Sequence, residues 1–169
     1  MLGWSCMAKR IRLIHDRYLV PWILENFPAN TFRFNVRLGR PTKEISAGIP
    51  ERYKGLAENW GLRCDCLAIW EGKVFIIEAF VRPNEMWKLA QLNAYETAFR
   101  QTESYRAYWS LPIQKILLTP ATNDLLNTEV KRYGIKIVVY CPKEIEYYLN
   151  TLFKWQSTPR GSGIEPTLP

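Results

Sequence analysis

Two acidic residues stand inside apolar stretches of the sequence, where a folded chain would bury them. Asp65 lies in the run Cys64 to Trp70, and Glu78 lies in the run Val74 to Val81. Burying an ionised carboxylate is unfavourable unless the group is paired or binds a cation. Carboxylate oxygens are ligands that suit hard divalent cations. Two carboxylates in neighbouring apolar segments therefore predict a divalent-metal site.

The two apolar runs are predicted to be adjacent antiparallel strands. Glu71-Gly72-Lys73 separates them, and its glycine suits the tight turn of a hairpin. A helix is predicted from Pro83 to about Ser104, with Gln91 and Tyr95 together one turn apart. We expect the packed face of this helix to consist of Met86, Leu89, Ala90, Asn93, Ala94, Thr97 and Ala98.

This order of residues resembles the PD-(D/E)XK nuclease superfamily. The similar elements are Asp65 on one strand, Glu78 on the next and Gln91-x-x-x-Tyr95 on the following helix. The last element is similar to that of the RecB-like and Cas4-like exonuclease branch. The resemblance implies an α/β (α+β) restriction-endonuclease-like core, with a central mixed β-sheet flanked by helices. The order of helices and strands is similar over about residues 31–140, and the motif residues lie within about residues 63–95.

The resemblance also implies a role for each of these residues. Asp65, Glu78 and the carbonyl group of Ala79 would bind Mg²⁺ or Mn²⁺, which offsets charge on the scissile phosphate. Gln91 and Tyr95 would orient the active-site residues or the DNA strand. An active protein of this kind would be a metal-dependent deoxyribonuclease.

One position departs from the family motif. The motif has a lysine two residues after the glutamate, and Phe80 stands there. An aromatic ring carries no charge, so it cannot stabilise charge that develops on a phosphate. Two cations could replace the lysine: Arg82 on the same strand, and Lys88, which could reach back from the start of the helix. Because a guanidinium stays protonated, Arg82 would act as a phosphate clamp, and Lys88 is the better candidate.

Positive charge is concentrated in the N-terminal third of the chain. The formal net charge is +7, and residues 1–56 hold ten Lys and Arg against four Asp and Glu, a net of +6. Such an asymmetry suits a polyanion, most often nucleic acid. A solvated basic surface without a partner is the alternative.

A strand with arginines is predicted from Thr31 to Leu38. Strict alternation would place Phe32, Phe34, Val36 and Leu38 on one face. Arg33 and Arg37 would share the other face, where they could follow a sugar-phosphate backbone. They could equally form a plain solvent face.

We expect one domain over residues 1–155, with a basic helical part over residues 1–30. Its length is sufficient for one sizeable core. The tail over residues 156–169 holds three prolines and two glycines without a core-forming pattern. Composition predicts a disordered tail, and an ordered one would be held most simply by a neighbouring subunit. The other predicted strands are residues 113–119 and 135–141, and the other predicted helices are residues 7–26, 51–60, 123–133 and 142–155. Pro21 is expected to kink or divide the first of these helices.

The compartment is predicted from what the sequence does not contain. No apolar stretch approaches the roughly 20 residues that span a bilayer, and the first residues show no secretion signal. We expect a cytoplasmic protein, or a virion component if it is viral. Cys64-x-Cys66, with one distant cysteine and one histidine, is poor spacing for zinc, so buried free thiols are expected.

Two functions compete at this point. The first is a degenerate or atypical nuclease fold that binds DNA or assembles with other subunits, as in a viral head completion or neck protein. Phe80 and the many Trp and Tyr residues favour it. The second is an active Mg²⁺- or Mn²⁺-dependent DNA exonuclease or endonuclease with a relocated lysine. A sequence-specific regulator has less support, because there is no helix-turn-helix or zinc-finger signature.

Overall fold

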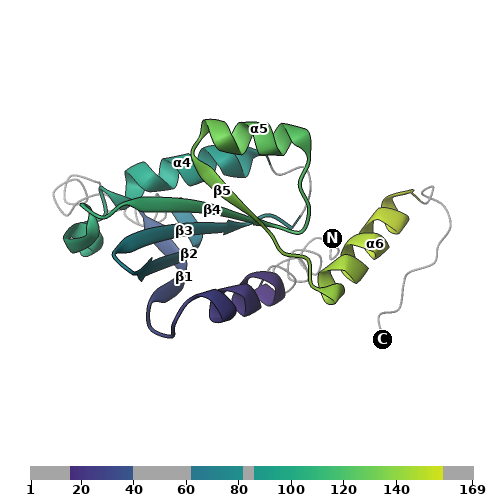
Figure 1. The fold of residues 1–169 in the computed structure, drawn as a ribbon, viewed down its shortest axis with the longest axis horizontal. Helices are drawn as coiled ribbons and strands as arrows, with labels where there is room; N and C mark the ends of the chain where they lie inside the picture. Colours follow the sequence, from purple (N-terminus) through teal and green to yellow (C-terminus); the bar gives the residue numbers. More distant parts are fainter. Residues whose placement is uncertain (1–15, 40–61, 82–85, 158–169) are drawn as a thin grey trace, which may run out of the picture.

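The chain forms a five-stranded mixed sheet with helices on both faces (Figure 1). The computed structural model describes residues 16–39, 62–81 and 86–157. The strands lie in the order β1-β2-β3-β4-β5. Neighbours are antiparallel from β1 to β3 and parallel from β3 to β5. This confirms the predicted mixed sheet between helices.

The elements have the following bounds. The strands are β1 (Phe32–Leu38), β2 (Leu62–Trp70), β3 (Lys73–Ala79), β4 (Ile113–Thr119) and β5 (Ile135–Val139). The helices are residues 16–26, α4 (Trp87–Phe99), the 3₁₀ helix η1 (Glu103–Tyr108), α5 (Asp124–Arg132) and α6 (Lys143–Ser157). The helix over residues 16–26 is continuous through Pro21, so the proline does not divide it.

Strands β2 and β3 are joined by a two-residue turn. Trp70 pairs with Lys73, and the turn residues Glu71 and Gly72 have φ angles of 48° and 69°. Two successive positive φ angles define a type I′ turn, whose twist matches that of the flanking strands. The predicted hairpin is therefore confirmed.

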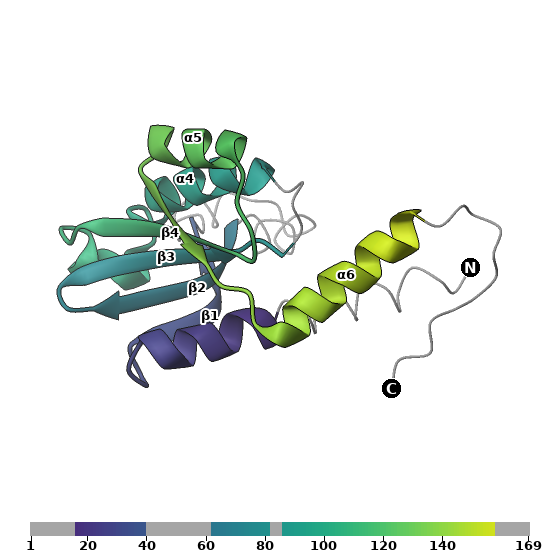
Figure 2. The same ribbon diagram turned by 45° about the vertical axis from the view of Figure 1, so that its right-hand side comes forward.

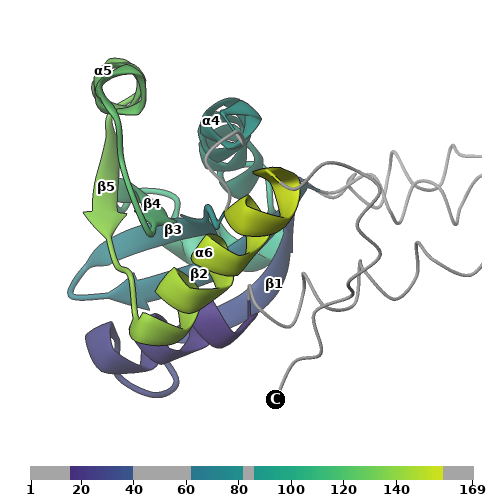
Figure 3. The same cartoon turned by 90° about the vertical axis from the view of Figure 1, so that its right-hand side faces the viewer.

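Two cores lie on opposite faces of the sheet (Figures 1 and 3). Helices α4 and α5 cover one face, where Leu92 and Leu126 are buried. The helix over residues 16–26 covers the other face together with Ile145 from the start of α6. Tyr148 and Leu149 of α6 also pack against this core, and beyond them the helix extends away from the sheet (Figure 2). Cys64 lies in the first core and Cys66 in the second, both as buried free thiols, as expected.

The alternation of side chains in β1 reverses at Asn35. This residue has a φ of 54°, in the left-handed region. Phe32 and Phe34 pack against the core of the 16–26 helix, whereas Val36 and Leu38 belong to the core of α4. The prediction of one apolar face in β1 is therefore wrong.

The same reversal separates the two arginines of β1. Since the apolar side chains change face at Asn35, Arg33 and Arg37 lie on opposite faces of the sheet. A shared arginine face is thus a wrong prediction, because a single left-handed residue shifts the two-residue period by one.

The packed face of α4 also differs from the predicted one. Its buried residues are Lys88, Leu89, Leu92, Tyr95, Ala98 and Phe99. Ala90, Asn93, Ala94 and Thr97 are exposed. Small residues such as alanine suit either side of a helix, so they did not define its orientation. The helix instead buries two polar side chains for which the sheet supplies partners.

Several predictions fall outside the described residues: the start of the first helix, the helix at 51–60, Arg82 and the tail from residue 158. In the described parts of the chain no helix is long and apolar enough to cross a membrane.

Candidate functional site

The site forms where β2 and β3 separate. Their backbone pairing ends at Cys66 with Ile77. Beyond this pair β2 remains paired with β1 as far as Leu62, and β3 remains paired with β4 as far as Ala79. Because each strand follows a different neighbour, the first residues after the pairing ends, Asp65 and Glu78, face each other across the opening.

Hydrogen bonds to the two carboxylates replace the missing strand pairing. The Asp65 N–H donates to Glu78 Oε1 at 3.0 Å, and the Ala79 N–H donates to Asp65 Oδ2 at 3.0 Å. Glu78 is 2% exposed, and the side chain of Asp65 is 20% exposed. Each acid is thus fixed by the backbone of the opposite strand, which lines up their remaining oxygens.

Lys88 reaches this point from the first turn of α4. Its Nζ donates to the Ala79 carbonyl oxygen at 2.6 Å and to Glu78 Oε2 at 3.2 Å. It also forms an ion pair with Asp65 Oδ2 at 3.6 Å. Lys88 is itself buried. We call Asp65, Glu78, the Ala79 carbonyl and Lys88 the Lys88 cluster.

The electrostatics of this cluster favour an additional cation. Burial, and after it the negative charge of Asp65, raise the pKa of Glu78, and the Lys88 ammonium lowers it, so that the pKa is about 8. One ammonium thus faces two carboxylates that repel each other. A second positive charge would favour the ionised form of Glu78.

The oxygen atoms of the cluster fit a divalent cation. Three of them, from Asp65, Glu78 and the Ala79 carbonyl, already converge on one positively charged atom, Lys88 Nζ. Within residues 16–39, 62–81 and 86–157, no group of three or more His, Cys, Asp or Glu side chains could hold a metal ion. Mg²⁺ commonly uses one or two carboxylates and completes its shell with water and substrate phosphates.

Phe80 takes no part in the polar contacts of the cluster. It lies two residues after Glu78, is 2% exposed and belongs to the core beneath α4. The strand position that carries lysine in the resembling family is thus an apolar packing position in this chain. The ammonium enters from the helix instead.

Gln91 and Tyr95 follow Lys88 along the same side of α4. The Tyr95 hydroxyl donates to the carbonyl oxygen of Arg63 in β2, and Tyr95 is fully buried. Gln91 Oε1 is buried and has no hydrogen-bond partner among the described residues. Tyr95 therefore ties α4 to the strand of Asp65, whereas Gln91 presents an acceptor that the described residues do not satisfy.

The two described arginines that were predicted to bind nucleic acid do not share a face of the sheet. Arg33 and Arg37 lie on β1, on opposite faces of the sheet. Arg82 lies outside the described residues. The structure therefore brings together Asp65, Glu78, Ala79, Lys88, Gln91 and Tyr95 of the predicted residues.

A second buried lysine was missed from the sequence. Lys115 on β4 is 7% exposed. Its Nζ lies 2.9 Å from Glu96 Oε2 and 3.0 Å from Asn93 Oδ1, both on α4. We call these three residues the Lys115 cluster. The signal in the sequence is one lysine inside the apolar strand Ile113–Thr119.

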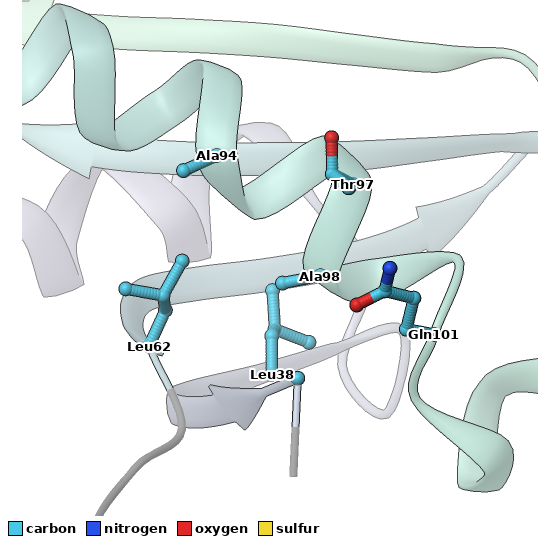
Figure 4. A pocket seen from close by; sticks show the side chains of 7 residues that line it. Leu38, Leu62, Ala94, Thr97, Ala98 and Gln101 are labelled. Atoms are coloured by element: carbon cyan, nitrogen blue, oxygen red, sulfur yellow. The ribbon is translucent and has the colours of Figure 1, made fainter. Parts of the chain in front are cut away.

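A shallow hollow of about 380 Å³ lies at the other end of α4 (Figure 4). Aliphatic and small side chains from β1, β2 and α4 line most of it, with Thr97 and Gln101 as its polar side chains. Among the described residues that line it, none is charged and none belongs to the Lys88 cluster.

Two solved structures are similar to part of the chain. One is a repair endonuclease from Pyrococcus abyssi, with a TM-score of 0.45 and 14% identity over 75% of this chain and 47% of that chain. The other is an EndoMS–dsDNA complex, with a TM-score of 0.44 and 15% identity over 75% of this chain and 44% of that chain. The chain thus spans less than half the length of either protein. No protein-family model and no curated protein matches the sequence.

Proposed function

We propose that this protein hydrolyses phosphodiester bonds in DNA at the Lys88 cluster, with Lys88 in place of the strand lysine that is missing at Phe80. The observation that carries the proposal is the position of Lys88 Nζ, 3.2 Å from Glu78 Oε2 and 2.6 Å from the Ala79 carbonyl oxygen. A buried ammonium beside two carboxylates can stabilise negative charge that develops on a phosphate. The net charge of +7 favours a polyanionic substrate.

Each residue of the site has a physical task in this proposal. Asp65, Glu78 and the Ala79 carbonyl would hold Mg²⁺ or Mn²⁺, and the bound cation would supply Lewis-acid chemistry. Lys88 would donate hydrogen bonds to a phosphate oxygen. Tyr95 holds α4 against β2 and so keeps Lys88 in position.

The same site has a second candidate function, DNA binding without hydrolysis. Lys88 Nζ lies where the three ligand oxygens converge, so its ammonium can take the place of a divalent cation. In that case the fold would serve as a DNA-binding subunit of a larger assembly. A viral head completion or neck protein is one setting for such a subunit.

Incubation with labelled DNA separates the two functions. The purified protein is mixed with single- and double-stranded DNA, with Mg²⁺, Mn²⁺ or a chelator, beside the variants Asp65→Ala and Glu78→Ala. We expect cleavage that requires the metal and both carboxylates. Lys115→Met is the matched control, because it removes a buried lysine outside the site, and it should retain cleavage.

If the protein binds DNA in a salt-sensitive way but cleaves it under none of these conditions, the result favours the second function. A crystal soaked in Mn²⁺ supplies an independent measurement. Anomalous density between Asp65 and Glu78 is expected for the hydrolase, and its absence would count against metal-dependent chemistry.

A further inference from the structure

Trp87 is an exposed aromatic side chain beside the Lys88 cluster. It is the first residue of α4 and is 60% exposed, whereas Leu89, Leu92 and Phe99 of the same helix are buried. A single exposed apolar residue is common on protein surfaces. What distinguishes Trp87 is its neighbour, since its ring centroid lies 5.8 Å from Lys88 Nζ.

The indole ring and the Glu78 carboxylate thus share one neighbouring side chain, Lys88. Lys88 Nζ is a neighbour of both groups, 5.8 Å from the ring centroid and 3.2 Å from Glu78 Oε2. A DNA phosphate held at the Lys88 cluster is joined to a sugar and a base, which together extend over a distance similar to that between the cluster and the indole ring. A base attached at or next to that phosphate can therefore meet the exposed ring.

An indole face can contact a nucleobase only if the base is not stacked inside a duplex. Proteins that bind single strands use aromatic rings in this way, because every base has a flat π-surface. Within paired DNA the faces of the bases are covered by their neighbours. An exposed ring beside a phosphate site therefore selects strands with unpaired bases.

We propose that Trp87 stacks on an unpaired base of the DNA strand whose phosphate lies at the Lys88 cluster, so that single-stranded or frayed DNA is the preferred ligand. This inference rests on the proposed function. Trp87 is a specificity-determining residue in it. Asp65, Glu78 and Lys88 act on the phosphate, and Trp87 acts on the neighbouring base.

The test compares Trp87→Ala and Trp87→Phe with Tyr147→Ala. Tyr147 lies on α6 and is also 60% exposed, so its loss controls for removing an exposed aromatic residue. Dissociation constants are measured by fluorescence anisotropy for a single strand, for the same strand with abasic sites, and for a blunt duplex, in Ca²⁺ to prevent cleavage. Thermal unfolding verifies that each variant is folded.

We expect Trp87→Ala to weaken single-strand binding roughly tenfold, which corresponds to the loss of one stacked base. Trp87→Phe should lose less, and Tyr147→Ala should bind as the wild type does. Abasic sites should weaken wild-type binding by a similar factor and have little further effect on Trp87→Ala. Duplex binding should be the same in all variants.

Equal affinity of Trp87→Ala and wild type for the single strand would overturn the inference while leaving the proposed function intact. An equal loss on the single strand, the abasic strand and the duplex would also overturn it, because stacking depends on a free base. If the wild type binds no form of DNA, the proposed function fails, and the inference fails with it.

Discussion

Helix α4 takes part in two buried lysine clusters that differ in their balance of charge. In the Lys88 cluster one ammonium faces two carboxylates, and the Glu78 side chain is 3% exposed. In the Lys115 cluster one ammonium faces one carboxylate and one amide, and the Glu96 side chain is 35% exposed. The Lys115 cluster is complete with its own residues and partly hydrated. In the Lys88 cluster two carboxylates lie close together around one ammonium, and their mutual repulsion favours binding of another cation.

The largest expected difference between the clusters is in stability. Lys88→Met removes the ammonium beside Glu78, a carboxylate that is almost fully buried. Breaking a buried ion pair from one side typically lowers the free energy of unfolding by about 3–5 kcal/mol. Lys115→Met leaves Glu96 accessible to water, and the expected loss is about 1 kcal/mol. Urea denaturation at pH 9, where Glu78 with its pKa of about 8 is ionised, measures both losses.

Mn²⁺ sharpens this first prediction. The metal should restore much of the stability of Lys88→Met, since it can occupy the position of the missing ammonium, and should leave the effect of Lys115→Met unchanged. Equal losses in the two variants, with no response to Mn²⁺, would show that both lysines are structural ion-pair partners.

Cleavage of DNA should separate the clusters by a second criterion. Removing one group that stabilises charge in a transition state lowers the rate by about 10²–10³-fold. We expect this loss for Lys88→Met, even in Mn²⁺ that restores its fold, and a loss within about threefold for Lys115→Met. Initial rates at saturating metal give the comparison. If Lys88→Met retains full activity, a cationic group other than Lys88 contacts the phosphate.

The sequence predicted those parts of the fold that depend on local chemistry. The Glu71-Gly72 turn fixed the hairpin, since both residues adopt positive φ angles there. The strand Ile113–Thr119 was predicted at its observed bounds, because Pro120 directly follows it and ends the segment. Asn123 was included at the start of the predicted helix, and its side chain accepts a hydrogen bond from the Leu126 N–H.

The remainder depends on contacts between distant segments. No local pattern shows that the pairing of β2 with β3 ends before Asp65, because the sequence of each strand indicates only that the strand is apolar. The left-handed Asn35 reverses the faces of β1 without any glycine to signal it. For the site, the apolar runs around Asp65 and Glu78 identified the two carboxylates, and Lys88 was proposed as a replacement for the lysine that the resembling family has at the position of Phe80. The Lys115 cluster was missed because its partners, Asn93 and Glu96, lie on a helix whose orientation was predicted incorrectly.

The pH dependence of stability should also differ between the clusters. The pKa of Glu78 is about 8 in the folded protein, whereas the ordinary pKa of a glutamate side chain is 4.5. Between these values the folded protein binds more protons than the unfolded chain, so the free energy of unfolding falls as pH rises from about 5 to about 8. We expect a fall of roughly 2 kcal/mol, because Glu78 titrates together with Asp65 and Lys88.

Glu78→Gln tests this assignment. It should remove the fall, whereas Asn93→Ala in the Lys115 cluster should retain it. Urea denaturation at pH 5, 6, 7 and 8 gives the slopes. A Glu78→Gln variant with the slope of the wild type would place the titrating group elsewhere.

The smallest expected effect concerns Gln91, the residue beside the Lys88 cluster whose buried Oε1 has no hydrogen-bond partner in the described part of the chain. An unsatisfied buried acceptor is unfavourable, so Gln91→Leu should raise the free energy of unfolding by about 0.5–1 kcal/mol. If a DNA group donates to this oxygen, the same variant should bind DNA several-fold more weakly. Gln101→Leu, at an exposed position of the hollow, should change neither quantity. If Gln91→Leu is more stable and binds DNA as the wild type does, Gln91 has only a packing role. If the variant is more stable but binds DNA more weakly, the DNA-binding surface extends from the Lys88 cluster along α4.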